Sequence, residues 1–134
     1  MALKVQGLCP LIQVFDMPTS VRFYRDLLGF EIVNSSPSRS ADDFDWCRLH
    51  HGDAALMLNT AYEFDSRPPM PNSARATAHE DTCFYIGCPD VDEAYLYLRA
   101  KGLDVKEPKV APYGMKQLYL KVPDGFEICF QWPV

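Results

Sequence analysis

Residues 16–30 read DMPTSVRFYRDLLGF, and a segment of the same design returns at residues 90–103 as DVDEAYLYLRAKGL. In both segments an aspartate opens the stretch, apolar residues recur at helical spacing, and a glycine followed by an apolar residue closes it. The aspartates Asp16 and Asp90 are therefore expected to cap two helices half a chain apart. A repeat of this size predicts one supersecondary unit used twice.

Strand-like runs surround each expected helix. One run precedes the helix and three follow it, so the order of one strand, one helix and three strands occurs twice. The expected strands are residues 8–15, 31–33, 46–50 and 54–59 in the first half, and residues 83–88, 104–106, 117–122 and 126–132 in the second. The sequence thus predicts an α+β fold in which two βαβββ modules form a curved mixed sheet around a central cavity.

The chain has 134 residues, which suits a single domain with one core. Module one is expected at approximately residues 5–62, a proline-bearing connector at 63–80, and module two at approximately 81–134. A connector of that length without regular structure is either mobile or functional. The ligand site is expected in the groove where the two related sheets meet.

Composition excludes several functional classes. Apolar residues make up 48% of the chain and charged residues 23%, which is typical of a globular protein. The formal net charge of −5 argues against nucleic-acid binding, and no apolar run suits a membrane span or a signal peptide. Five cysteines, an odd number without a CxxC pair, fit reduced thiols in a cytoplasmic protein.

Three segments carry a resemblance to a known family. They are residues 16–30, the segment GDAALMLN at 52–59, and the segment PDGFEICF at 123–130. Together they resemble the vicinal oxygen chelate superfamily, which is also called the glyoxalase, bleomycin-resistance and extradiol-dioxygenase superfamily. This resemblance implies paired βαβββ modules, a cavity between curved sheets and assembly as a homodimer. It implies either a metal-dependent lyase, isomerase, dioxygenase or thiol transferase, or a metal-free protein that sequesters drugs.

The resemblance also implies where metal ligands would stand. In metal-using relatives these positions carry His, Glu or Gln, but here they fall on Cys9, Cys83, Cys129 and either Leu56 or Met57. None of these residues is a histidine or a glutamate. We therefore expect no metal of the superfamily type and no cofactor, with the cysteines packed as small apolar side chains.

Two other arrangements remain open. Gln13 and Glu127 lie two or four residues from the implied positions on the same strand faces, and they could hold a hard ion. Alternatively, the three cysteines could converge as thiolates around zinc or cuprous copper. The three histidines are expected in loops or at a hairpin tip, with solvent-exposed roles.

Alternation of side chains along the strands selects the candidate ligand-binding residues. Aromatic, sulfur-bearing and polar residues share the strand faces expected to line the groove, a composition that suits a planar or amphipathic small molecule. An arginine there can bind a carboxylate or phosphate, and Glu127 is the candidate catalytic base. The ligand-binding candidates are Gln13, Trp46, Arg48, Met57, Asn59, Cys83, Tyr85, Tyr113, Met115 and Cys129.

Three functions follow from this pattern. The first is a glyoxalase- or bleomycin-resistance-like protein that binds a small, aromatic or amphipathic molecule without a metal. The second is a metal-dependent lyase or isomerase of the glyoxalase I type, with Glu127 as ligand or base. The third is a sequestering or regulatory protein that performs no chemistry.

Overall fold

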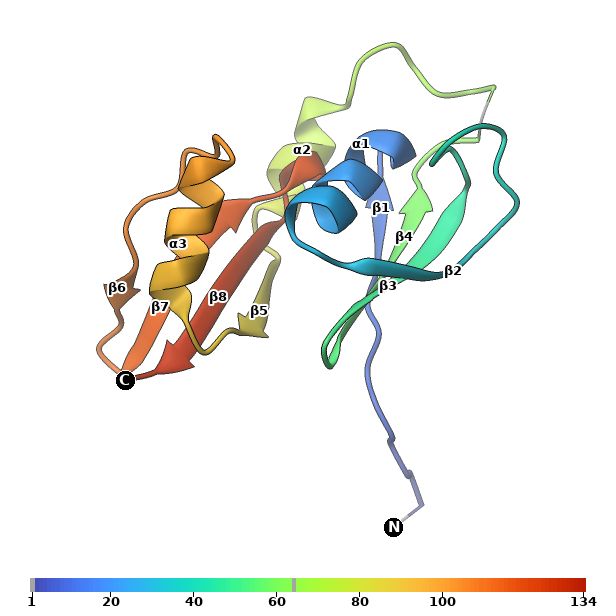
Figure 1. Cartoon of the computed structure of the whole chain (residues 1–134). Coiled ribbons are helices and arrows are strands. Elements are labelled where there is room, and N and C mark those ends of the chain that lie inside the picture. The colour runs from blue at the N-terminus through green and yellow to red at the C-terminus, as the bar shows by residue number, and fades with distance from the viewer. Residues whose placement is uncertain (1, 64) are drawn as a thin grey trace. The chain divides into compact units, whose positions relative to one another are not determined.

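The computed structural model describes residues 2–63 and 65–134, and the chain divides into two compact units. Unit 1 comprises Met1–Pro69 and unit 2 comprises Met70–Val134. Figure 1 shows a mixed sheet in each unit. In the part of the chain that is described, no helix has the length and apolar character needed to cross a membrane.

Unit 1 contains one complete βαβββ module. Its sheet has the strand order β1-β4-β3-β2, in which β1 runs parallel to β4 and the other neighbours are antiparallel. The elements are β1 (Leu11–Val14), α1 (Met17–Val21) continued by the π-helical segment η1 (Arg22–Leu27), β2 (Glu31–Ser35), β3 (Trp46–His51) and β4 (Ala54–Thr60).

Unit 2 repeats this topology. Its strand order is β5-β8-β7-β6, again with one parallel pair, β5 and β8, and antiparallel neighbours elsewhere. The elements are α2 (Ser73–His79), β5 (Cys83–Gly87), α3 (Val91–Ala100), β6 (Lys109–Val110), β7 (Met115–Lys121), the turn η2 (Pro123–Gly125) and β8 (Glu127–Pro133). The predicted α+β fold with two βαβββ modules is therefore confirmed.

The capping residues fix the two main helices where the sequence predicts them. The carboxylate of Asp16 accepts a hydrogen bond from the Thr19 N–H at 3.1 Å, and that of Asp90 accepts one from the Glu93 N–H at 2.9 Å. Each bond satisfies an N–H that has no partner within the helix. Each helical segment is followed by a glycine with a positive φ, as expected for a helix end.

Each sheet buries one face against its helix. In unit 1, β4 contacts α1, and in unit 2, β7 and β8 contact α3. The resulting cores include Ile12, Val14, Val21, Tyr24, Leu49 and Leu58 in unit 1, and Val91, Leu98, Leu118, Leu120 and Ile128 in unit 2. The residues that alternate with these strand positions form the opposite, open face of each sheet.

Two strand positions and the connector differ from the predictions. The first strand begins at Leu11 instead of residue 8, and the strand expected at 104–106 lies four to five residues later, as β6. A proline precedes each new start, Pro10 and Pro108, and proline has no N–H to donate to a strand ladder. The connector holds the helix α2, which the sequence does not reveal because it buries no residue and so has no apolar periodicity.

Candidate ligand-binding site

The open face of unit 2 collects most of the predicted site residues of the second module. Strand register sets them in three rows across the sheet. The first row is Cys83, Glu127 and Lys121; the second is Tyr85, Cys129 and Tyr119; the third contains Gln131 and Gln117. Of the predicted residues, the structure thus brings together Cys83, Tyr85, Glu127 and Cys129.

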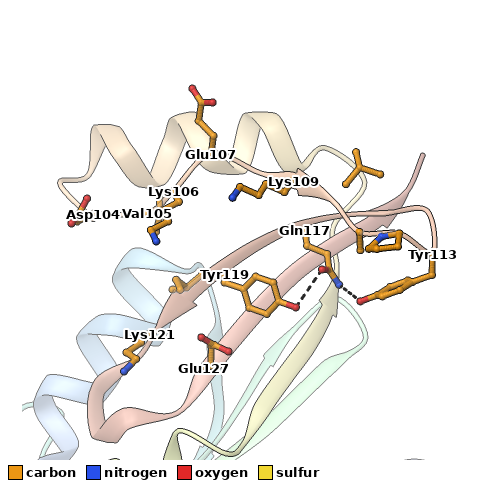
Figure 2. Close-up of a pocket in the computed structure, with 14 residues that line it drawn as sticks. Asp104, Val105, Lys106, Glu107, Lys109, Tyr113, Gln117, Tyr119, Lys121 and Glu127 are labelled. Atoms are coloured by element: carbon orange, nitrogen blue, oxygen red, sulfur yellow. Dashed lines mark hydrogen bonds between the residues drawn. The ribbon is translucent and has the colours of Figure 1, made fainter.

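A cavity of about 890 Å³ borders this open face. Its lining comes from the segment between α3 and β7, residues 104–107 and 109–113, and from side chains of β7 and β8 (Figure 2). Three lysines and three acidic residues take part, namely Lys106, Lys109, Lys121, Asp104, Glu107 and Glu127. Because the two signs are balanced, the cavity suits a molecule with little net charge.

A chain of hydrogen bonds, which we call the polar chain, crosses the wall of this cavity. The Tyr119 hydroxyl donates to Gln117 Oε1 at 3.3 Å, and Gln117 Nε2 donates to the Tyr113 hydroxyl at 2.7 Å and to Gln131 Oε1 at 2.9 Å. The Tyr85 and Tyr119 hydroxyl oxygens are 3.2 Å apart. Figure 2 shows Gln117 between the two tyrosines that it joins.

Most of these bonds have a fixed direction. The Tyr119 hydroxyl donates to Gln117 Oε1, whereas in the Tyr85–Tyr119 pair either hydroxyl can be the donor. Tyr113 accepts from Gln117, so its own hydrogen has no partner within the polar chain. Tyr113 therefore presents a hydrogen-bond donor at the cavity wall.

The two tyrosines of the second row enclose a cysteine. Tyr85 and Tyr119 are the lateral neighbours of Cys129, and their rings meet edge to face with centroids 6.4 Å apart. Cys129 is completely buried. The hydrogen bond with Tyr85, reinforced by burial, raises the pKa of the Tyr119 hydroxyl, so this group stays protonated at neutral pH.

Glu127 and Cys83 are direct neighbours on adjacent strands. Burial, followed by the negative charge of Glu127, raises the pKa of the Cys83 thiol from 9.0 to about 11. Lys121, on the other side of Glu127, bonds the Glu80 carboxylate at 2.7 Å. Glu127 is half-buried and lines the cavity, which places a carboxylate beside any bound molecule.

The residues at the implied metal positions are not the histidine and glutamate ligands of metal-using relatives. Burial raises the pKa of the Cys129 thiol as well as that of the Cys83 thiol. In unit 1, Leu56 belongs to the buried core. Within residues 2–63 and 65–134, no three His, Cys, Asp or Glu side chains gather in a way that could hold a metal.

The remaining predicted residues of module two flank the polar chain. Tyr113 lies in the loop between β6 and β7, and Met115 begins β7 opposite Pro133 of β8. Tyr113 lines the cavity and is 68% exposed. This loop therefore contributes Tyr113 to the cavity wall, and the resemblance implies an aromatic residue there.

Unit 1 gathers its five predicted residues on its own open face. Gln13, Asn59 and Trp46 form one row across three strands, and Arg48 lies beside Met57 in another. Asn59 Nδ2 and Gln13 Oε1 are 3.3 Å apart. These residues therefore line one surface, as strand alternation predicts, and the groove between the modules stays a prediction.

Sequence reasoning missed the polar residues of β7, Gln117 and Tyr119. A usable signal was present, because the Asp124-Gly125 turn joins β7 to β8 and fixes which β7 residues lie beside Glu127 and Cys129. The lysines at 106 and 109 had no such signal, since their segment reaches the cavity only through the path of the chain after α3.

Besides His50, which bonds Arg48, two histidines that were expected to face solvent have structural partners. His79 stacks on Phe126 with ring centroids 4.0 Å apart, and its Nδ1 lies 2.6 Å from the Asp124 carbonyl oxygen. His51 Nδ1 lies 3.1 Å from the Leu28 carbonyl oxygen. Neither histidine lines the cavity of unit 2.

Comparison with known proteins decides the family. The model of the Glyoxalase/Bleomycin resistance protein/Dioxygenase superfamily matches residues 8–130. The chain belongs to this superfamily. A relative within reach of sequence comparison is a virulence protein of Salmonella typhimurium, 27% identical over 119 residues, which are 86% of this chain and 75% of that protein.

Solved structures of the superfamily share the fold. TnmS3, an antibiotic-binding protein from Streptomyces sp. CB03234, has a TM-score of 0.72 at 22% identity, covering 100% of this chain and 99% of its own. A bleomycin-binding protein from Streptomyces verticillus, solved with copper(II)-bleomycin, has a TM-score of 0.67 at 21% identity, covering 96% of each chain. At these identities the likeness establishes the fold of this superfamily member.

Proposed function

We propose that this superfamily member binds a small aromatic or amphipathic molecule at the open face of unit 2, without a metal of the superfamily type. The polar chain on the wall of the 890 Å³ cavity carries this proposal. Within the polar chain, Tyr119 supplies the face of an aromatic ring and Tyr113 supplies one oriented hydrogen-bond donor. An oriented polar group beside an aromatic ring gives a small molecule both a contact surface and a fixed orientation.

Relatives support the chemical class of the ligand. TnmS3 binds an antibiotic, and the protein from Streptomyces verticillus binds copper(II)-bleomycin. Here the balanced charges of the cavity favour a neutral or zwitterionic body with an acceptor atom near Tyr113. We favour binding without turnover over lyase or isomerase chemistry because the implied ligand positions carry Cys9, Cys83 and Cys129 in place of histidine or glutamate.

A fluorescent probe tests the cavity directly. Nile red is an uncharged aromatic dye with a carbonyl acceptor, and we expect saturable binding to the full chain in the presence of a chelator. Tyr119→Ala should weaken binding about tenfold through the lost ring, and Tyr113→Phe about threefold through the lost donor. Tyr97→Phe, on the exposed surface of α3, is the matched control and should bind as the wild type does.

A second measurement separates a binding protein from an enzyme. Bleomycin, incubated with the protein and the chelator, should raise the melting temperature and be recovered chemically unaltered. Equal probe affinity in Tyr119→Ala and wild type would contradict the assigned site. Conversion of the ligand only after addition of nickel or zinc, and its loss in Glu127→Gln, would favour the metal-dependent lyase or isomerase.

A further inference from the structure

A second cavity, on unit 1, surrounds an arginine with no acidic partner. Three other arginines of this unit, Arg25, Arg39 and Arg67, each bond a carboxylate. Arg48, half-buried on β3, instead donates from Nε to Nε2 of His50 at 2.9 Å. In the described part of unit 1, no carboxylate lies within ion-pair distance of Arg48.

The partner of Arg48 orients it without cancelling its charge. The accepting Nε2 atom of His50 orients the guanidinium and supplies no carboxylate charge. The bond occupies only the Nε–H of the guanidinium. Its two terminal nitrogens, Nη1 and Nη2, keep their hydrogens for another acceptor. Arg48 thus combines a fixed direction with an uncompensated positive charge.

Space for that acceptor is present in front of the arginine. Arg48 and His50 line a cavity of about 540 Å³ whose other walls include the small residues Gly52, Ala54 and Ala55. Small side chains leave room for an incoming group to approach the guanidinium. Arg48 also lies beside Met57 across the strands, an apolar neighbour that excludes water and strengthens a charged contact.

We propose that this cavity of unit 1 binds the oxyanion group of a small metabolite, a carboxylate or a phosphate, held by Arg48. A guanidinium fork presents two parallel N–H groups that match two oxygens of such a group. Asp53 lines the same cavity, and its negative charge opposes the binding of an oxyanion. This site is argued from residues of unit 1 alone, and its oxyanion probes are applied separately from the aromatic probe of unit 2.

Nuclear magnetic resonance titration of the full chain tests this site. The probes are inorganic phosphate and acetate, added separately, with chloride at equal ionic strength as the reference. We expect saturable shifts of the Arg48 Nε–H signal and of the amides of Gly52, Ala54 and Ala55. Saturation by phosphate alone or by acetate alone supports the site and identifies its preferred oxyanion. Absence of saturation with both probes overturns the proposal.

Charge variants identify the residue that binds. Arg48→Gln should weaken oxyanion binding about tenfold or more, and Arg48→Lys should weaken it less, because charge remains and the fork is lost. Arg22→Gln is the matched control, since Arg22 is an exposed arginine of the same unit that bonds only the Thr19 hydroxyl at 3.4 Å. An equal loss of affinity in Arg22→Gln and Arg48→Gln would refute the assignment.

Removal of the opposing charge gives an independent readout. Asp53→Asn leaves Arg48 and His50 in place and should tighten phosphate or acetate binding severalfold. This variant keeps the proposal testable even where Arg48→Gln does not fold. Unchanged or weaker binding in Asp53→Asn would show that the oxyanion lies outside this cavity.

Discussion

Tyr113 and Arg48 show how a neighbour gives a side chain its chemistry. Gln117 donates to Tyr113 and thereby leaves the tyrosine hydrogen available, while His50 accepts from Arg48 and thereby leaves its charge available. In both cases a partner without a carboxylate orients a polar group without neutralising it. Each of these residues can therefore recognise a ligand group of its own kind, an acceptor atom and an oxyanion.

Cys83 gives a prediction about thiol reactivity. With a pKa of about 11 instead of 9.0, its thiolate fraction at pH 8 is roughly 100-fold below that of an ordinary thiol, and alkylation should be correspondingly slow. The rate should keep rising with pH up to about pH 11, as the thiol loses its proton. Peptide mass spectrometry after timed iodoacetamide treatment measures this rate at Cys83.

The same experiment identifies the cause of the shift. Glu127→Gln removes the negative charge that raises the pKa of Cys83, so alkylation at pH 8 should become faster. Glu107→Gln removes an equal charge from the same cavity lining but not from the neighbourhood that acts on Cys83. Equal acceleration by both variants would contradict this electrostatic account.

The turn between β7 and β8 and the helix α2 depend on each other. Gly125 has a φ of +92°, and a Cβ at this position would overlap the backbone carbonyl of Ala76 in α2. The backbone carbonyl oxygen of Asp124, in the same turn, accepts a hydrogen bond from Nδ1 of His79 in α2. The Asp124-Gly125 turn, which the sequence predicts, therefore stabilises α2, which the sequence does not predict.

Two glycine substitutions separate backbone strain from crowding. Gly125→Ala should lower the free energy of unfolding by about 3 kcal/mol, because a left-handed conformation and a clash with α2 add together. Gly102→Ala has nearly the same φ, +90°, but meets no atom within 4 Å, so about 1 kcal/mol is expected. Urea denaturation followed by circular dichroism compares them, and equal losses would exclude a contribution from α2.

Exposed apolar side chains on the intact chain bear on its assembly. Residues 2–10 hold no regular structure, and Leu3, Val5 and Leu8 along them are 74%, 75% and 85% exposed. Apolar surface of this kind is commonly covered by a partner. We therefore expect a homodimer, with a mass near twice 15.2 kDa in sedimentation equilibrium at micromolar concentration. A mass of 15.2 kDa under these conditions would contradict the expectation.

Sequence patterns were sufficient for the modules, their helices and part of each open face. Caps, apolar periodicity and strand alternation act over a few residues, so Asp16, Asp90 and the 123–130 segment could be interpreted without coordinates. They also placed Tyr85, Glu127 and Cys129 on one surface, because side-chain direction alternates strictly along a strand.

The cavities and the hydrogen-bond partners could be identified only from the tertiary structure. Lys106 and Lys109 reach the cavity of unit 2 because the chain after α3 runs past β7, and Glu127 lies beside Cys83 because β8 pairs with β5. Such features arise from packing and register between segments distant in the sequence. No local periodicity encodes them, since each depends on the three-dimensional position of several side chains at once.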